Sequence, residues 1–355
     1  MNNNRLFGLD YLRGFAAFII LIYHFLSWSG FDNLVDANTF IGRFGIYGVS
    51  IFYVLSGLTL FHVYFNKKNP LSKENIKHFF VKRIFRIYPL LWLVIIITVV
   101  FKPNLYNAYT IIINLSGLYG YIDWGNYIAV GSWSIGNELV FYSFFPLFIG
   151  VFNSNKIFLK YLLSFVILGM YIYFASFSLS SSQPLREQWV EYTNPLNQLF
   201  LFFSGFILGY FFQNIKFNNY TLLIVLFLGI IIFSFYPSTS ESISIVTNDK
   251  RYVFTLSCIL ISLSLYKLNL QRITDSLVHK TLSFFGDISY SMYLIHPIVY
   301  SFVGLLIVKL NLDIQGIVYY KILISILLSI ILSGLVFNYL EKYFIKIGNS
   351  VIYQK

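Results

Sequence analysis

Long apolar stretches alternate with short polar segments along the whole chain. Each has about 20 residues, the length at which a helix rising 1.5 Å per residue crosses a hydrocarbon core of about 30 Å. The pattern therefore predicts an all-α polytopic membrane protein with about ten transmembrane helices. The predicted helices cover residues 12–28, 44–65, 84–101, 137–153, 157–176, 195–213, 220–236, 252–268, 288–310 and 316–338.

One further apolar piece, residues 108–121, is shorter and is interrupted by glycine. Lys and Arg gather in cytoplasmic loops, and the loop after the second predicted helix carries seven of them against Glu74 alone. The later lysine-rich loops also lie on the cytoplasmic side only if residues 108–121 do not cross the membrane. We therefore predict a re-entrant or interfacial segment there, with both termini in the cytoplasm.

Composition excludes an ordinary soluble protein, because 57% of the residues are hydrophobic and 11% are charged. The formal charge of +11 is assigned to cytoplasmic loops and not to nucleic-acid binding. The single cysteine, Cys258, lies in an apolar run, so we expect neither disulfides nor a thiol nucleophile. The five histidines are too scattered to show metal-ligand spacing, and no metal is expected.

The first predicted helix carries Arg13 near its start and His24 near its far end. Their spacing puts them about 16 Å apart along a helix and about 20° apart around it. An ionisable group in a bilayer costs about 3 kcal/mol, which suggests one polar cavity reached from two depths. The alternatives are an arginine that snorkels to the headgroups and a histidine that bonds a neighbouring helix.

Two arginines, Arg83 and Arg86, precede Tyr88 at the cytoplasmic start of the third helix. Side chains three residues apart share a helix face, and paired guanidinium groups suit phosphate oxygens. Positive charge at a cytoplasmic helix end is the simpler explanation.

Glu138 is an acid near the outer start of the fourth helix, where a carboxylate could orient His24 or merely cap the helix. His296 in the ninth helix precedes Pro297. It could line the same cavity, or satisfy a carbonyl that the proline leaves free.

Taken in order, four patterns resemble the acyltransferase 3 family, multi-pass bacterial membrane enzymes that acylate cell-surface carbohydrates. The chain departs from the family at Leu139, where relatives often have a second acid, and at Tyr343, where they often have proline. The matching patterns are Arg13 with His24, Arg83 with Arg86, Trp133-Ser134-Ile135 with Glu138, Phe141 and Tyr142, and the 289–294 run with His296.

The resemblance implies an O-acyltransferase, an acetyltransferase in the first instance, that uses cytoplasmic acetyl-CoA or another acyl-CoA. The acceptor would be a hydroxyl of a cell-envelope polysaccharide, such as O-antigen, capsule or exopolysaccharide, or of its lipid-linked precursor. His24 would act as general base or transient acyl carrier, with Glu138 beside it. Arg13, Arg83 and Arg86 would hold the donor. Substrate or cavity-lining positions would be Asp10, Tyr88, Trp133, Ser134, Tyr142, Ser291 and His296.

We expect one membrane domain over residues 1–345, a short cytoplasmic tail over residues 346–355 and no fused soluble domain. The expected location is the bacterial cytoplasmic membrane, in contact with its lipids. An exporter or flippase of a glycan would also place a polar cavity among ten helices, and a non-catalytic envelope scaffold is the third alternative.

Overall fold

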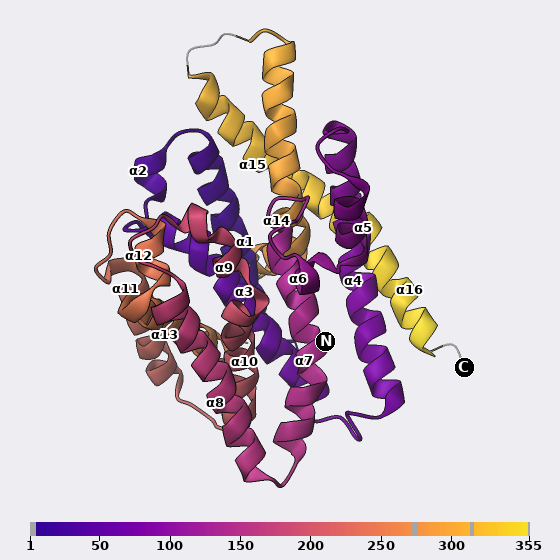
Figure 1. Cartoon of the computed structure of the whole chain (residues 1–355), viewed down its shortest axis with the longest axis vertical. Coiled ribbons are helices and arrows are strands. Elements are labelled where there is room, and N and C mark those ends of the chain that lie inside the picture. Colours follow the sequence, from indigo (N-terminus) through magenta and orange to yellow (C-terminus); the bar gives the residue numbers. More distant parts are fainter. Residues whose placement is uncertain (1–4, 271–275, 313–315, 354–355) are drawn as a thin grey trace.

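The computed structural model describes residues 5–270, 276–312 and 316–353, and every regular element within these ranges is a helix (Figure 1). Ten of the described α-helices have 17 or more residues. They are α1 (Phe7–Trp28), α3 (Phe40–Tyr64), α4 (Lys73–Phe101), α7 (Ser132–Asn153), α8 (Ile157–Tyr173), α10 (Pro195–Phe212), α11 (Asn219–Phe235), α13 (Asn248–Lys267), α14 (Leu277–Lys309) and α15 (Ile317–Val336).

Shorter helices connect or extend these ten. Two π-helical segments, Phe174–Ser178 and Phe337–Glu341, continue α8 and α15, and the second leads directly into the last helix. Of the predicted tail, residues 354–355 lie outside the described residues. The short α-helices are α2 (Asp32–Val35), α5 (Ala108–Ser116), α6 (Tyr119–Ile122), α9 (Trp189–Thr193), α12 (Ser242–Val246) and α16 (Lys342–Tyr353).

Each of the ten predicted transmembrane helices corresponds to one long helix, so the all-helical polytopic fold is confirmed. Within the described ranges, eight helices are long and apolar enough to cross a membrane. The two that fall short are α11, with 17 residues, and α13, whose first turn carries Asp249, Lys250 and Arg251. Ten crossings and cytoplasmic termini therefore stay predictions.

The segment predicted not to cross the membrane forms α5 and α6, of nine and four residues. Both are far shorter than the roughly 20 residues a crossing needs. Gly117 separates them with φ +74°, a left-handed conformation that glycine adopts without strain. Two side chains of α4 tie the segment down: Tyr88 Oη donates to the Ser116 carbonyl at 2.8 Å, and Trp92 Nε1 donates to the Leu115 carbonyl at 2.7 Å.

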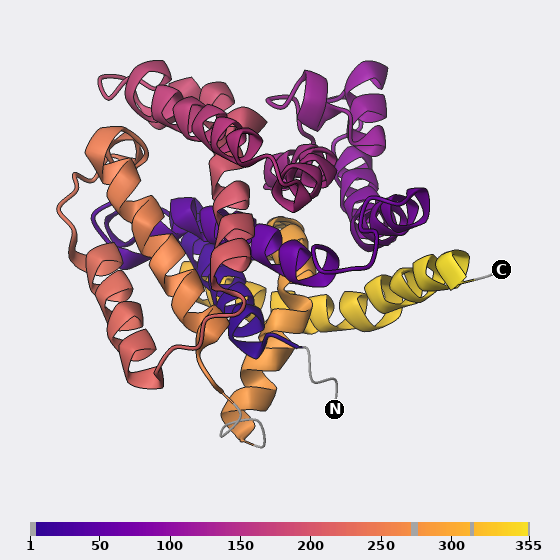
Figure 2. The ribbon, with the colours of Figure 1, turned by 90° about the horizontal axis from the view of Figure 1, so that it is seen from below.

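Helix α1 lies at the centre of the bundle, between α14 and α3 (Figure 2). Glycines allow the close approach: a Cβ on Gly14 would lie 2.5 Å from the backbone nitrogen of Gly286 in α14. Likewise, a Cβ on Gly57 of α3 would lie 1.9 Å from the carbonyl oxygen of Phe202 in α10. Small residues thus let neighbouring helices touch backbone to backbone, as is common in membrane bundles.

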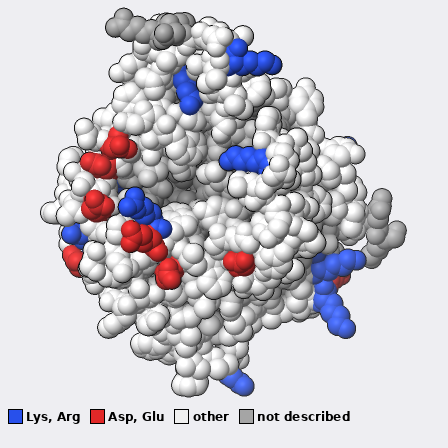
Figure 3. All heavy atoms as spheres, turned by 45° about the horizontal axis from the view of Figure 1, so that its top comes forward, with Lys and Arg blue, Asp and Glu red and all other residues white. Residues whose placement is uncertain are grey.

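We name the two ends of the bundle by the ends of α1. The Phe7 end bears the lysine-rich loop before α4, and the Trp28 end bears the loops around α2, α9 and α12. Acidic side chains gather on one side of the Trp28 end, beside a hollow in that face (Figure 3). This charge difference agrees with a Phe7 end that faces the cytoplasm.

Candidate active site

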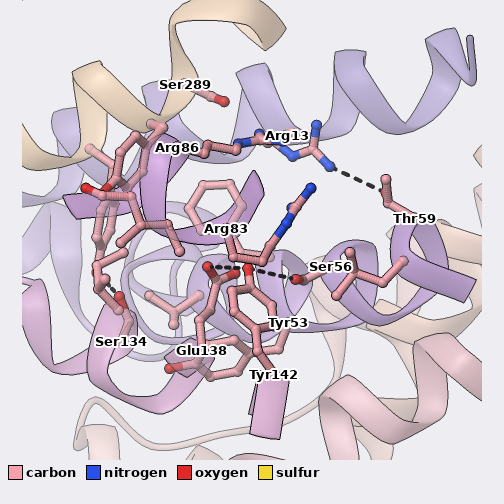
Figure 4. A pocket seen from close by; sticks show the side chains of 17 residues that line it. Arg13, Tyr53, Ser56, Thr59, Arg83, Arg86, Ser134, Glu138, Tyr142 and Ser289 are labelled. Atoms are coloured by element: carbon pink, nitrogen blue, oxygen red, sulfur yellow. Dashed lines mark hydrogen bonds between the residues drawn. The ribbon is translucent and has the colours of Figure 1, made fainter. Parts of the chain in front are cut away.

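Three arginine side chains line one cavity in the half of the bundle nearer the Phe7 end (Figure 4). Arg13 reaches it from α1, and Arg83 and Arg86 reach it from one face of α4. The free space of the cavity, counted with the solvent at its mouth, is about 770 Å³. The other polar side chains that line this arginine cavity are Tyr53, Ser56, Thr59, Ser134, Glu138, Tyr142, Ser289, Tyr290 and Tyr293.

The arginines are held by few contacts from the protein itself. Arg13 donates to Asp10 Oδ1 at 3.1 Å and to Thr59 Oγ1 at 3.4 Å. The Arg83 guanidinium carbon lies 5.9 Å from the centre of the Tyr142 ring. Its Nε is buried and has no hydrogen-bond partner among the described residues, a state that costs about 1–3 kcal/mol. An oxygen-rich ligand in the cavity would relieve that cost.

Glu138 supplies the only carboxylate among the described residues that line the cavity. It accepts a hydrogen bond from Tyr142 Oη at 2.8 Å, and it lies close enough to all three arginines to interact with their charges. Three guanidinium groups against one carboxylate leave a formal excess of two positive charges. The cavity is therefore suited to an anion.

A second cluster forms around His24, farther along α1. His24 Nδ1 lies 2.9 Å from His296 Nε2 of α14, and the planes of the two imidazole rings differ by 15° with their centres 5.0 Å apart. The Trp28 ring stacks on the His24 ring, with the ring centres 5.0 Å apart and the planes 11° from parallel. His296 is 1% exposed, and its Nδ1 lies 3.0 Å from the Met292 carbonyl oxygen. His296, which precedes Pro297, thus contacts His24 and also bonds a carbonyl of the preceding turn.

His24 also lines a pocket that opens at the Trp28 end, with about 1150 Å³ of free space counted with the solvent at its mouth. Aromatic rings and charged groups surround it, including Trp28, Trp189, Arg186 and Glu241. We call it the Trp28 pocket. Its remaining lining residues are Tyr23, Ser27, Gly45, Ile46, Pro184, Leu185 and Ser242.

The structure corrects the prediction of one cavity shared by Arg13 and His24. Arg13 and His24 line separate pockets. The Phe52 and Tyr293 rings, which pack together at 5.8 Å, are part of the lining of the arginine cavity. Tyr293 contacts both sites: it lines the arginine cavity, and the centre of its ring lies 6.3 Å from that of the His296 ring.

The expected support of His24 by Glu138 is not observed either. Hydropathy placed the start of this helix at residue 137, but α7 begins at Ser132. Glu138 consequently lies about 9 Å inside the helix and faces the arginine cavity. The partner of His24 is His296.

The other predicted positions divide between the cavity and its supports. Ser134 and Tyr142 line the cavity, and Ser134 Oγ lies 3.0 Å from Tyr293 Oη. Four predicted residues are not part of the cavity lining. Asp10 bonds Arg13 and Arg5, Tyr88 bonds the last residue of α5, Trp133 packs on Trp189 at 5.6 Å, and Ser291 donates to Glu341.

Several site residues were missed by sequence reasoning. Tyr293 belongs to the 289–294 pattern but was not singled out, and Ser56 and Thr59 lie in an ordinary apolar helix that gives no sequence signal. Trp28 was treated as the end of a span. Among the described residues, no group of three or more His, Cys, Asp or Glu side chains is arranged to hold a metal ion.

The fold and the two sites define a polytopic helical membrane protein with a cationic cavity and, at another depth, a hydrogen-bonded histidine pair. A family model described as an acyltransferase domain matches residues 6–339. The chain therefore belongs to the acyltransferase 3 family, and the resemblance seen in the sequence is confirmed.

Proteins named O-acetyltransferase OatA from Staphylococcus aureus strains NCTC 8325, COL and MRSA252 are each 25% identical over 362 aligned residues. The match covers 94% of this chain and 56% of each relative, so the chain spans about half the length of these curated relatives. No solved structure matches the chain.

Proposed function

We propose that this protein is a membrane O-acyltransferase that transfers an acetyl group from acetyl-CoA to a hydroxyl of a cell-envelope polysaccharide or its lipid-linked precursor. One observation carries the proposal: three arginines line one cavity, and α1, which contributes Arg13 to it, also presents His24 to a second pocket. Family membership and the name O-acetyltransferase of the relatives support the same reaction class.

The arginine cavity would hold the phosphate groups of the donor. Its formal excess of two positive charges and the unpaired Nε of Arg83 match a ligand with several anionic oxygens. The cavity lies toward the lysine-rich Phe7 end, where a cytoplasmic donor would enter. The thioester of the donor supplies the activated acyl carbon.

The Trp28 pocket would hold the acceptor. Trp28 and Trp189 offer aromatic faces to a sugar. Arg186 can donate hydrogen bonds, and the Glu241 carboxylate can accept them. His24 lines this pocket, so a hydroxyl bound there can give its proton to the imidazole as the acyl group is transferred. Glu138 would act at the donor, where it balances the arginines and fixes Tyr142.

The pocket arrangement requires the donor to reach past the ring of Tyr293. Arg13 and His24 are about 16 Å apart along α1, so the acyl end of the donor must extend from the cavity toward the histidine pair. The location we propose is the bacterial cytoplasmic membrane, with both termini in the cytoplasm and the family domain within residues 1–345.

The test is the ester content of the surface polysaccharide in cells that express the chain. We expect acetyl ester with the parent, and its loss in His24→Ala and Arg83→Ala variants at matched membrane abundance. The matched control is Lys77→Ala, an exposed lysine of the same helix as Arg83 that lies outside the cavity. Unchanged ester in all variants, with altered amounts of surface glycan, would instead identify an exporter.

A further inference from the structure

We propose that His296 is a positioning residue that fixes the tautomer of His24, so that Nε2 of His24 is the unprotonated nitrogen presented to the Trp28 pocket. The inference deepens the proposed function and rests on it for the chemical step. The assignment of the protons rests on hydrogen-bond geometry and on the burial of His296.

The first step concerns His296 Nδ1, which lies 3.0 Å from the carbonyl oxygen of Met292. A carbonyl oxygen only accepts hydrogen bonds, so this nitrogen must carry the proton. Pro297 has no N–H, so the carbonyl that it leaves without a helical donor is that of Tyr293, and the bond to Met292 belongs to the His296 ring itself.

The second step concerns Nε2 of His296, 2.9 Å from Nδ1 of His24. His296 is 1% exposed, and its ring neighbours among the described residues are Phe25, Trp28, Tyr293 and His24. None of these is an acid, so a buried imidazolium would lack a counter-charge, and the neutral form is favoured. A neutral His296 protonated on Nδ1 has a lone pair on Nε2.

The third step follows at His24. A lone pair on His296 Nε2 requires a donor opposite, so His24 carries its proton on Nδ1. Its own Nε2 is then the basic nitrogen left for a ligand in the Trp28 pocket. Stacking on Trp28 at 5.0 Å and the bond to His296 together fix the plane of the ring.

The reaction balances with a thioester donor and a hydroxyl acceptor. The acceptor proton moves to His24 Nε2, the acceptor oxygen forms a bond to the acyl carbon, the carbon–sulfur bond breaks, and His24 returns the proton to sulfur. While His24 is an imidazolium, its Nδ1–H bond to His296 becomes charge-assisted and therefore about twice as strong as a neutral bond. His296 thus supports the charged intermediate without touching the substrate.

The direct test is nitrogen-15 NMR of histidine-labelled protein in lipid vesicles, with the His24 signals assigned by their loss in His24→Gln. We expect a protonated Nδ1 and an unprotonated Nε2 in the parent, and loss of this single tautomer in His296→Leu. A parent with the proton on His24 Nε2 would overturn the inference, whatever its activity. Parent protein with the expected tautomer but without acyl transfer would overturn only the proposed function.

A pair of variants separates positioning from packing. In His296→Gln, the amide oxygen of glutamine can take the place of Nε2 and accept the hydrogen bond from His24 Nδ1. In His296→Leu, the side chain has no atom that can accept it. We expect the Leu variant to lose about 100-fold in kcat with an unchanged KM for the donor, and the Gln variant to recover most of the rate. The comparison uses variants whose unfolding temperature equals that of the parent protein. Equal rates in the two variants would then contradict the inference.

Discussion

At the scale of single residues, the site depends on which charged side chains the helices bring together. Two arginines three apart on a helix must share a face, and the structure places Arg83 and Arg86 in one cavity. The sequence could not show that Arg13 joins them, because that depends on how α1 packs against its neighbours. Nor could it show the contact between His24 and His296, which are 272 residues apart.

Removal of Arg86 should weaken donor binding. Each charge-assisted hydrogen bond contributes about 1.5–3 kcal/mol, so Arg86→Ala should raise the Kd for acetyl-CoA by about 10-fold to 100-fold. Titration calorimetry in detergent measures this. The Lys77→Ala control removes the same charge from an exposed position of the same helix and should leave the Kd unchanged. Equal effects would show that general charge, and not the cavity, attracts the donor.

Glu138→Gln separates charge balance from catalysis. Glutamine can still accept the hydrogen bond from Tyr142, but the substitution removes the carboxylate that lines the cavity with the three arginines. We expect a lower unfolding temperature without donor, donor affinity at least as high as in the parent, and recovery of stability when donor is added. A loss of kcat with unchanged stability would instead assign Glu138 to the reaction.

At the scale of helices, hydropathy predicted the presence and order of the long helices but did not predict all of their ends correctly. Apolar runs stop where polar residues begin, yet buried Ser132 and Ser134 belong to the first turn of α7. This five-residue error at the start of the helix is what made Glu138 look like a partner for His24. The distance between two packed helices depends on the size of the side chains between them, which hydropathy does not report.

The contact between α1 and α14 should depend on Gly14. A Cβ there would lie 2.5 Å from a backbone nitrogen of α14, so Gly14→Ala must push the two helices apart and disturb the His24–His296 contact. We expect a lower thermal unfolding temperature together with slower acyl transfer. Gly169→Ala is the matched control, because a Cβ on that exposed glycine of α8 meets no atom within 4 Å. Similar unfolding temperatures for both variants would contradict close packing at Gly14.

At the scale of the whole molecule, loop charges predicted an orientation that packing alone does not define. The short helices α5 and α6 agree with the prediction that residues 108–121 do not cross. Lysine-rich loops then share the Phe7 end, and the acidic face in Figure 3 is the opposite end.

Cysteine labelling in intact cells tests this orientation. The native Cys258 is fully buried, so it gives little background. A Glu187→Cys variant at the exposed Trp28 end should react with a membrane-impermeant maleimide from outside, and a Lys77→Cys variant should react only after the membrane is opened. The reverse pattern would place the donor cavity on the wrong side for a cytoplasmic acyl donor.

The central claim is that the arginine cavity and the histidine pair serve one acyl transfer. Its most direct measurement is acetyl-CoA consumption by the protein in lipid vesicles, followed as release of free thiol and as acetyl ester on an added envelope glycan. We predict both products in equal amounts for the parent, ester loss in His24→Ala with acetyl-CoA still bound, and weakened binding in Arg83→Ala. Equal ester formation by the parent and both variants would contradict the account.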